Sequence, residues 1–240
     1  MLANWPVAIL AGGLATRLRP ATNKTPKALL RVAGEPFLVH QLRLLHSEGF
    51  RKVIICVGYL GEAIEANIGD GSTLGLHIDY SFDGPTLLGT GGALKRALPK
   101  LGEKFLVIYG DSYMPVDYAA IVQAFVVSRK PALMTVCENE GRWDASNLWF
   151  ESGEIRRYSK KLRTSEMRHI DYGIAVLSAS VFGSFPGDAM FDLADVYSRL
   201  VSEKQVAAYE VKQRFYQIGS REGLAELDAL LGSRPASIPA

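Results

Sequence analysis

The chain has 240 residues, 48% of them apolar and 22% charged, proportions that are ordinary for a soluble globular protein. Its 27 lysines and arginines nearly balance 25 aspartates and glutamates, and a formal charge of +2 argues against nucleic acid or an anionic membrane as the main partner. Any recognition of an anion must therefore come from a local cluster of charges.

The N-terminus lacks the basic segment and long apolar stretch of a signal peptide. No run of the sequence approaches the roughly 18 consecutive apolar residues of a membrane span. Cys56 and Cys137 each lie inside an apolar run, which predicts buried, reduced thiols. We therefore expect a soluble cytoplasmic protein.

In the first half of the chain, short apolar runs alternate with helical patterns. Strands are predicted from their brevity and β-branched content over Val7–Ala11, Lys52–Gly58, His77–Phe82, Phe105–Gly110 and Ala132–Glu138. Helices are predicted over Pro36–Glu48, where proline takes the first position, and over Asp117–Arg129, where Asp117 is the N-cap. This alternation predicts an α/β fold, with a Rossmann-like, mainly parallel mixed sheet flanked by helices.

The second half of the chain is less regular. A hairpin is predicted from Asn147–Ser152 and Glu154–Ser159, followed by a strand over Tyr172–Leu177. Helices are predicted over Phe191–Glu203 and Arg221–Leu231. Because no repeat, low-complexity segment or linker interrupts the chain, a single domain over residues 1–240 is expected.

The most informative segment follows the first strand and reads Leu10-Ala-Gly-Gly-Leu-Ala-Thr-Arg-Leu-Arg-Pro20, with Thr25-Pro-Lys27 after it. A glycine pair at the carboxyl end of a parallel strand lies where open α/β sheets bind ligands. The glycines allow backbone N–H groups to approach a phosphate chain, and Arg17 and Lys27 supply cations for its oxygens. The segment has neither the Gly-Lys-Ser/Thr of a Walker loop nor the third glycine of a dinucleotide fingerprint.

This segment resembles the signature of the sugar-1-phosphate nucleotidyltransferases, G-G-x-G-T-R-L-x-P followed by P-K, with Ala15 in place of one glycine. The resemblance covers residues 7 to about 231 and implies a GT-A-like nucleotidyltransferase fold. It implies that the loop wraps a nucleoside triphosphate, whose charge the catalytic residues Arg17 and Lys27 neutralise. The loop residues thus assigned to the nucleotide are Leu10, Ala11, Gly12, Gly13 and Thr16.

A second motif, Leu88-Gly-Thr-Gly-Gly-Ala-Leu94, resembles the family's L-G-T-A-G-A element. The resemblance implies that Gly89 and Thr90 pack against the nucleoside. Asp83 lies just upstream, where the family often has a Glu or Gln that faces the base. A carboxylate there could accept hydrogen bonds from guanine N1–H and N2–H₂, which uracil and thymine do not offer. The alternative is that Asp83-Gly84-Pro85 forms only a turn.

Asp111 ends an apolar strand, and because an unpaired buried carboxylate is unfavourable, it should meet a cation or a donor. The resemblance assigns it to the catalytic Mg²⁺, which proteins usually hold with carboxylates and phosphate oxygens. The family's second metal ligand is an aspartate, but this chain has Gln217 there. Its carbonyl could still be a ligand, directly or through water. Otherwise the metal is held mainly by Asp111 and the phosphates, or another acid such as Asp171 helps. Alternatively, Asp111 caps a turn.

The acceptor side is predicted from two further segments. The segment Glu154–Lys161 resembles the family stretch that delivers a lysine to the acceptor's phosphate, with either Lys160 or Lys161 in register. Asp171 and Gly173 match positions that face the sugar ring. A solvated strand end and a core strand are the simpler alternatives. The predicted division is a nucleotide-binding part over about residues 1–138 and a sugar-phosphate-binding part over about 139–232.

The resemblance implies an Mg²⁺-dependent enzyme that transfers a nucleotidyl group from a nucleoside triphosphate to a sugar 1-phosphate and releases pyrophosphate. The motifs look closest to the D-glycero-α-D-manno-heptose 1-phosphate guanylyltransferases, which would make GTP the donor and GDP-heptose, a precursor of bacterial surface polysaccharide, the product. The alternatives are a uridylyltransferase acting on N-acetylmuramate 1-phosphate or a hexose 1-phosphate, and a non-catalytic regulator that binds nucleotide or sugar. No nucleic acid or membrane partner is expected, and a homo-oligomer is left open.

Overall fold

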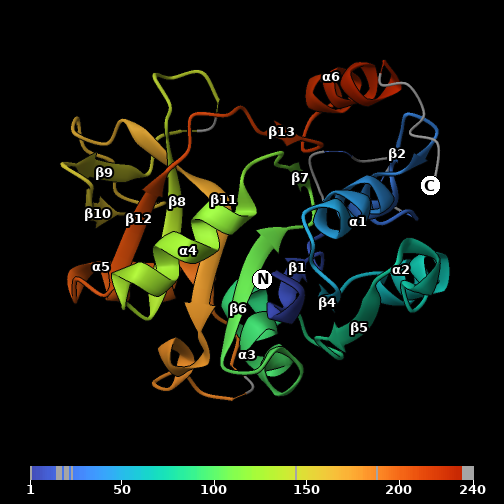
Figure 1. The fold of residues 1–240 in the computed structure, drawn as a ribbon, viewed down its shortest axis with the longest axis horizontal. Coiled ribbons are helices and arrows are strands. Elements are labelled where there is room, and N and C mark those ends of the chain that lie inside the picture. The colour runs from blue at the N-terminus through green and yellow to red at the C-terminus, as the bar shows by residue number, and fades with distance from the viewer. Residues whose placement is uncertain are drawn as a thin grey trace.

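The computed structural model describes residues 2–14, 18, 22, 24–143, 145–187 and 189–233. Among these, a mixed sheet of nine strands forms the centre of the molecule (Figure 1). Its strands are β1 (Val7–Leu10), β4 (Lys52–Val57), β5 (His77–Phe82), β6 (Lys104–Tyr109), β8 (Ala132–Glu138), β9 (Leu148–Glu151), β10 (Glu154–Tyr158), β11 (His169–Ser178) and β12 (Val206–Glu210).

Most of the sheet is parallel. The strand β1 lies between β4 and β6 and is parallel to both, and β5 continues the parallel series beyond β4. The long strand β11 is antiparallel to β6 on one side and to β8 on the other, and β12 is parallel to β8. The predicted fold class, a mainly parallel mixed sheet flanked by helices, is confirmed.

Helices cover both faces of the sheet because the central strands bury side chains on both sides. Val7 and Ile9 of β1 belong to one core cluster, with apolar residues of α1 (Phe37–Ser47), α2 (Gly61–Ile68) and α4 (Tyr118–Ser128). Ala8, between them, belongs to the other cluster, with α3 (Gly89–Leu101) and α5 (Leu193–Ser202). This alternation follows from the period of two in a β-strand.

The predicted elements are found, with small shifts at their ends. Pro36 lies in the short strand β3 (Glu35–Pro36), and α1 starts one residue later. Asp117 caps α4 as predicted, because its side chain accepts a hydrogen bond from the Ala120 N–H at 2.9 Å. The helix α5 starts at Leu193 instead of Phe191, because Asp192 is its N-cap. Three elements, α2, α3 and β12, were not predicted from the sequence.

Two short antiparallel strand pairs lie outside the large sheet. One joins β2 (Arg31–Val32) to β3. The other joins β7 (Ser112–Tyr113), directly after Asp111, to β13 (Tyr216–Gln217), which precedes the last helix α6 (Arg221–Gly232). This second pair brings the C-terminal part of the chain to the end of β6.

Cys56 and Cys137 are buried and free, as predicted. Within the part of the chain that the structure describes, no helix is both long enough and apolar enough to cross a membrane.

Candidate active site

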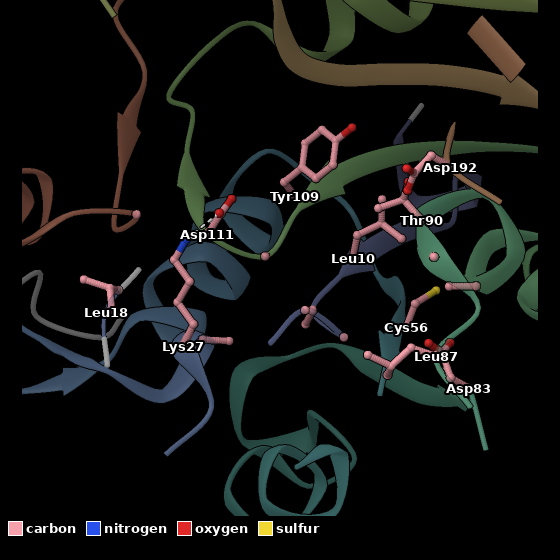
Figure 2. Close-up of a pocket in the computed structure, with 18 residues that line it drawn as sticks. Leu10, Leu18, Lys27, Cys56, Asp83, Leu87, Thr90, Tyr109, Asp111 and Asp192 are labelled. Carbon is pink, nitrogen blue, oxygen red and sulfur yellow. Dashed lines mark hydrogen bonds and ion pairs between the residues drawn. The ribbon is translucent and has the colours of Figure 1, made fainter. Parts of the chain in front are cut away.

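A cavity of about 400 Å³ lies at the carboxyl ends of β1, β4 and β6. This is the edge of a parallel sheet at which α/β proteins bind ligands. Half of the 18 residues that line it were predicted to bind substrate (Figure 2): Leu10, Ala11, Gly12, Gly13, Lys27, Asp83, Gly89, Thr90 and Asp111. Thr16 and Arg17 lie outside the described residues.

At one end of the cavity, the Lys27 ammonium lies 2.6 Å from Asp111 Oδ2 (Figure 2). Lys27 starts a short 3₁₀ helix after Pro26, and Asp111 follows β6. The other carboxylate oxygen of Asp111 accepts a hydrogen bond from the Ser112 hydroxyl at 3.1 Å. The lysine side chain is 16% exposed and the aspartate side chain 34%, so both charges remain within reach of a ligand.

Gln217 lies close to this ion pair but does not line the cavity. In the β7–β13 ladder it is paired with Ser112, the neighbour of Asp111. The Ile218 N–H donates to the Asp111 carbonyl at 3.0 Å, which fixes the ladder to the end of β6. Across the described residues, no three His, Cys, Asp or Glu side chains come together as a metal site.

At another end of the cavity, Asp83 is nearly buried, with 6% of its surface exposed. Its Oδ2 accepts a hydrogen bond from the Leu88 N–H at 3.1 Å, which stabilises the loop between the two residues. The same carboxylate also lines the cavity. Burial raises the pKa of the Asp83 carboxyl, although the Leu88 N–H and the Arg96 charge act in the opposite direction. The two interpretations of Asp83, a turn residue and a residue of the binding site, are therefore compatible.

The start of α3 forms a further wall, and its glycines are needed for packing. The N–H groups of Gly91 and Gly92 donate to the Phe191 carbonyl at 3.0 and 3.2 Å. A Cβ on Gly91 would lie 2.4 Å from the Phe191 ring, and one on Gly92 would lie 2.6 Å from the Ala189 carbonyl oxygen. Gly91 stands where the L-G-T-A-G-A motif has alanine, and the aromatic ring of Phe191 takes up that space.

The model of the family described as "Nucleotidyl transferase" matches residues 7–143, which is more than half of the chain. The chain belongs to this nucleotidyl transferase family. The match contains the cavity's glycine pair, Lys27, Asp83 and Asp111, so the predicted nucleotide-side residues lie in the part that establishes the family.

Relatives of this nucleotidyl transferase differ in substrate. The chain is 43% identical over 116 residues to the N-acetylmuramate alpha-1-phosphate uridylyltransferase of Neisseria meningitidis. This match covers 48% of the chain and 50% of that protein. The chain is 29% identical over 217 residues to the mannose-1-phosphate guanylyltransferase catalytic subunit beta of Drosophila melanogaster, covering 88% of this chain and 58% of that protein. The chain thus spans about half the length of these two curated relatives.

Among solved structures, the fold resembles that of HddC from Yersinia pseudotuberculosis complexed with GMP-PN. The TM-score is 0.78 and the identity 24%, with 95% of this chain and 99% of that chain covered. At this identity the likeness establishes the shared fold alone.

None of the four predicted acceptor residues of this nucleotidyl transferase lines the cavity, but Asp171 and Gly173 lie beside it. Asp171 accepts a hydrogen bond from the Gly173 N–H at 3.0 Å. Gly173 has φ of +106°, and a Cβ there would lie 3.6 Å from the Tyr109 ring, so glycine fits both the backbone and the close packing. Because Tyr109 lines the cavity, Asp171 and Gly173 lie behind one of its walls.

The two candidate lysines differ in their relation to Asp171. Burial raises the pKa of Asp171 to about 6, and the charge of Lys160 acts against this rise. Lys160 therefore lies within electrostatic reach of the predicted sugar-binding carboxylate, and no such interaction is resolved for Lys161. Both lysines are exposed.

The sequence analysis missed several residues of the site, chiefly Asp192, Tyr109 and Cys56, all of which line the cavity. Burial, with the nearby Asp83 charge, raises the pKa of the Cys56 thiol to about 12, so this wall presents a neutral thiol. Asp192 lay in a segment whose 3.6-residue periodicity indicated only an amphipathic helix. The Asp192–Asp195 spacing of a capping box could have marked it as a helix N-cap, but only the fold places it in the cavity.

Proposed function

We propose that the protein transfers a nucleotidyl group from GTP to D-glycero-α-D-manno-heptose 1-phosphate and releases pyrophosphate. The observation that carries the transferase reaction is the union, in one cavity, of the Gly12-Gly13 backbone, the Lys27 ammonium and the Asp111 carboxylate. A cation and a carboxylate at the end of a parallel strand suit a nucleoside triphosphate with its metal ion.

The proposed reaction is an in-line attack of the acceptor's phosphate oxygen on the α-phosphorus, with pyrophosphate as the leaving group. Lys27 and Arg17 would neutralise the triphosphate, while Lys160 would hold the acceptor phosphate. The protein forms no covalent intermediate in this scheme. Its contribution is to bring two mutually repelling anions together and to stabilise the charge that develops on the α- and β-phosphates.

The residues at the end of β6 fit a magnesium ion. Mg²⁺ prefers hard oxygen ligands and is commonly held by one or two carboxylates together with substrate phosphates. Asp111 supplies a part-exposed carboxylate, and Gln217, one ladder position away, supplies an amide oxygen. When bound, the ion would neutralise phosphate charge. Asp111 would anchor it, and Lys27 would then be released to the phosphates.

The preference for GTP rests on Asp83, whose carboxylate lines the cavity beside Leu87 and matches the donors of guanine. Relatives that act on a guanylyl donor, and the HddC structure complexed with GMP-PN, support this choice. A uridylyltransferase acting on N-acetylmuramate 1-phosphate is the second candidate, because the relative of that name is 43% identical over 116 residues. Soluble substrates and two reduced cysteines would suit a cytoplasmic enzyme.

The test is pyrophosphate release in Mg²⁺ with four nucleoside triphosphates and a panel of sugar 1-phosphates that includes the manno-heptose and N-acetylmuramate compounds. Release that requires GTP and the heptose would support the full proposal, and loss of release in EDTA would support the metal. Release with another pair would overturn the substrate assignment. Binding of nucleotide without release by any pair would favour a non-catalytic regulator.

A further inference from the structure

Asp192 is a carboxylate of the cavity to which no role has been given above. It precedes α5 and lines the cavity next to Thr90, whose hydroxyl lies 3.4 Å from Asp192 Oδ1. Among the described residues, no lysine or arginine forms an ion pair with it, in contrast to Asp111, which is paired with Lys27. A carboxylate in a cavity that lacks a cationic partner is suited to accept hydrogen bonds from a neutral ligand.

The cap of α5 also uses side chains other than the Asp192 carboxylate. The Leu193 N–H donates to Thr90 Oγ1 at 2.8 Å, and the Asp192 N–H donates to Asp195 Oδ2 at 3.2 Å. Two of the donors at this helix start are therefore satisfied without the Asp192 carboxylate. The Asp192 carboxylate takes part in the capping box with Asp195, and it also lines the cavity.

Asp192 lines the same cavity as Tyr109, whose ring packs near Gly173 of the predicted acceptor segment. In Figure 2, Tyr109 lies between Asp111 on one side and Asp192 with Thr90 on the other, while Asp83 and Leu87 lie at a different end. Burial raises the pKa of Tyr109 well above its ordinary value, and the charges of Asp171, Asp111 and Asp192 add to this rise. Tyr109 thus lies within electrostatic reach of both Asp192 and the predicted sugar-binding carboxylate.

A buried tyrosine supports the same placement. Tyr158 is 4% exposed, and its hydroxyl has no hydrogen-bond partner among the described residues. Its pKa is raised chiefly by burial, and the carboxylates of Asp171 and Asp192 contribute. A buried hydroxyl without a partner leaves room for a further hydrogen-bonding group near these carboxylates.

We propose that Asp192 determines acceptor specificity by accepting hydrogen bonds from hydroxyls of the sugar, so that neutral, polyhydroxylated sugar 1-phosphates are favoured over acceptors with a carboxylate of their own. The inference rests on the proposed transferase function. Asp192 and Asp171 are two carboxylates whose negative charges both act on Tyr109, and Lys160 lies within electrostatic reach of Asp171. A third carboxylate on the acceptor would be repelled there, since like charges in a partly buried site are unfavourable.

The test uses Asp192→Asn and Asp192→Ser, which remove the charge but keep residues that serve well as N-caps. Asp195→Ala is the matched control, because it removes the other side chain of the cap without altering the cavity lining. The acceptors are the neutral hexose or heptose 1-phosphate that the wild type uses best, together with one hexose 1-phosphate and its uronate, which differ only in a carboxylate.

We expect both Asp192 variants to raise KM for the neutral acceptor by about 10- to 100-fold, the range for hydrogen bonds to a charged acceptor, and to leave KM for the nucleotide unchanged. The preference for the neutral sugar over its uronate should shrink by a similar factor. The inference is overturned if KM changes for the nucleotide instead, if no KM changes, or if Asp195→Ala has the same effects. Absence of turnover by the wild type would instead overturn the transferase proposal itself.

Discussion

Lys27 and Asp111 are 84 residues apart in the sequence, and their side chains meet at 2.6 Å in the candidate active site. Each charge was assigned to a different part of the substrate, the lysine to phosphate and the carboxylate to a metal ion. The ion pair holds both groups in place and balances their charges before a substrate enters. Binding of a metal–nucleotide complex would replace this ion pair with two pairs of opposite charges, Lys27 with phosphate and Asp111 with the metal ion.

Replacing Asp111 tests this arrangement. Asp111→Asn should lower kcat for pyrophosphate release by roughly 10²-fold or more, the scale of a lost electrostatic stabiliser. Its melting temperature should change little, because part-exposed ion pairs contribute only about 0–1 kcal/mol. Turnover near that of the wild type would contradict the role of Asp111. The surface variant Asp79→Asn, which also loses ion pairs, is the control and should keep full activity.

Asp83→Asn should reduce kcat/KM for GTP by about 10-fold or more, while the value for UTP changes much less, because only guanine offers two donors to a carboxylate. The amide oxygen of asparagine can still accept the Leu88 N–H, so the loop should persist. Steady-state kinetics with both nucleotides would measure the difference. Equal losses for GTP and UTP would show that Asp83 supports the loop and does not select the base.

Gly91→Ala should destabilise the protein by about 1–3 kcal/mol, since its Cβ would lie 2.4 Å from the Phe191 ring in a packed contact. For a domain of this size, this corresponds to a fall in Tm of about 2–4 °C for each kcal/mol. Thermal unfolding of the variant and the wild type would measure this fall in Tm. The control is Gly232→Ala, at a helical glycine with no atom within 4 Å of the added methyl group, which should be neutral or slightly stabilising.

Asp171 should make stability depend on pH. Its folded-state pKa of about 6 lies above the ordinary value of 3.8, so the folded protein binds the proton more tightly than the unfolded chain does. The stability from this group is therefore full below about pH 4 and is lost as pH rises to about 6. The loss amounts to roughly 3 kcal/mol.

Asp171→Asn avoids this loss, and its amide oxygen can keep the hydrogen bond from Gly173. The variant should therefore be more stable than the wild type at pH 7.5, with the difference in unfolding free energy shrinking towards pH 4. Denaturant unfolding at both pH values would measure the two differences. A difference that is independent of pH would contradict the raised pKa.

The strands and helices that depend on interactions between residues close in sequence could be predicted from the sequence. The strands around β1 and the capped helix α4 follow from short apolar runs and from Asp117, and the structure contains both. The helix α3 was missed because Gly-Thr-Gly-Gly at its start and Pro99 in its last turn are poor helix formers. Its stability comes from Ala93, Leu94 and other buried side chains that pack against the sheet. Helix propensity does not include this packing.

In the candidate site, too, only residues close in sequence could be predicted to lie together. Residues within one motif, such as Gly12 and Gly13, could be predicted together because the chain itself places them together. Asp192 could not, since its place in the cavity depends on a contact with Thr90, 102 residues earlier. Its own segment indicated only a helix. Likewise, the sequence left Lys160 and Lys161 equivalent, because their difference lies in the distance to a carboxylate on another strand.

The contact between the start of α3 and the segment before α5 also constrains the order of folding. Closing a loop of about 100 residues is entropically costly, and contacts of this range form late. A nascent chain that has emerged from the ribosome only as far as β8 would carry its glycine pair and Asp111 but would lack the wall made by Phe191 and Asp192. During refolding, the complete cavity should therefore form only after the segment before α5 has docked on the start of α3.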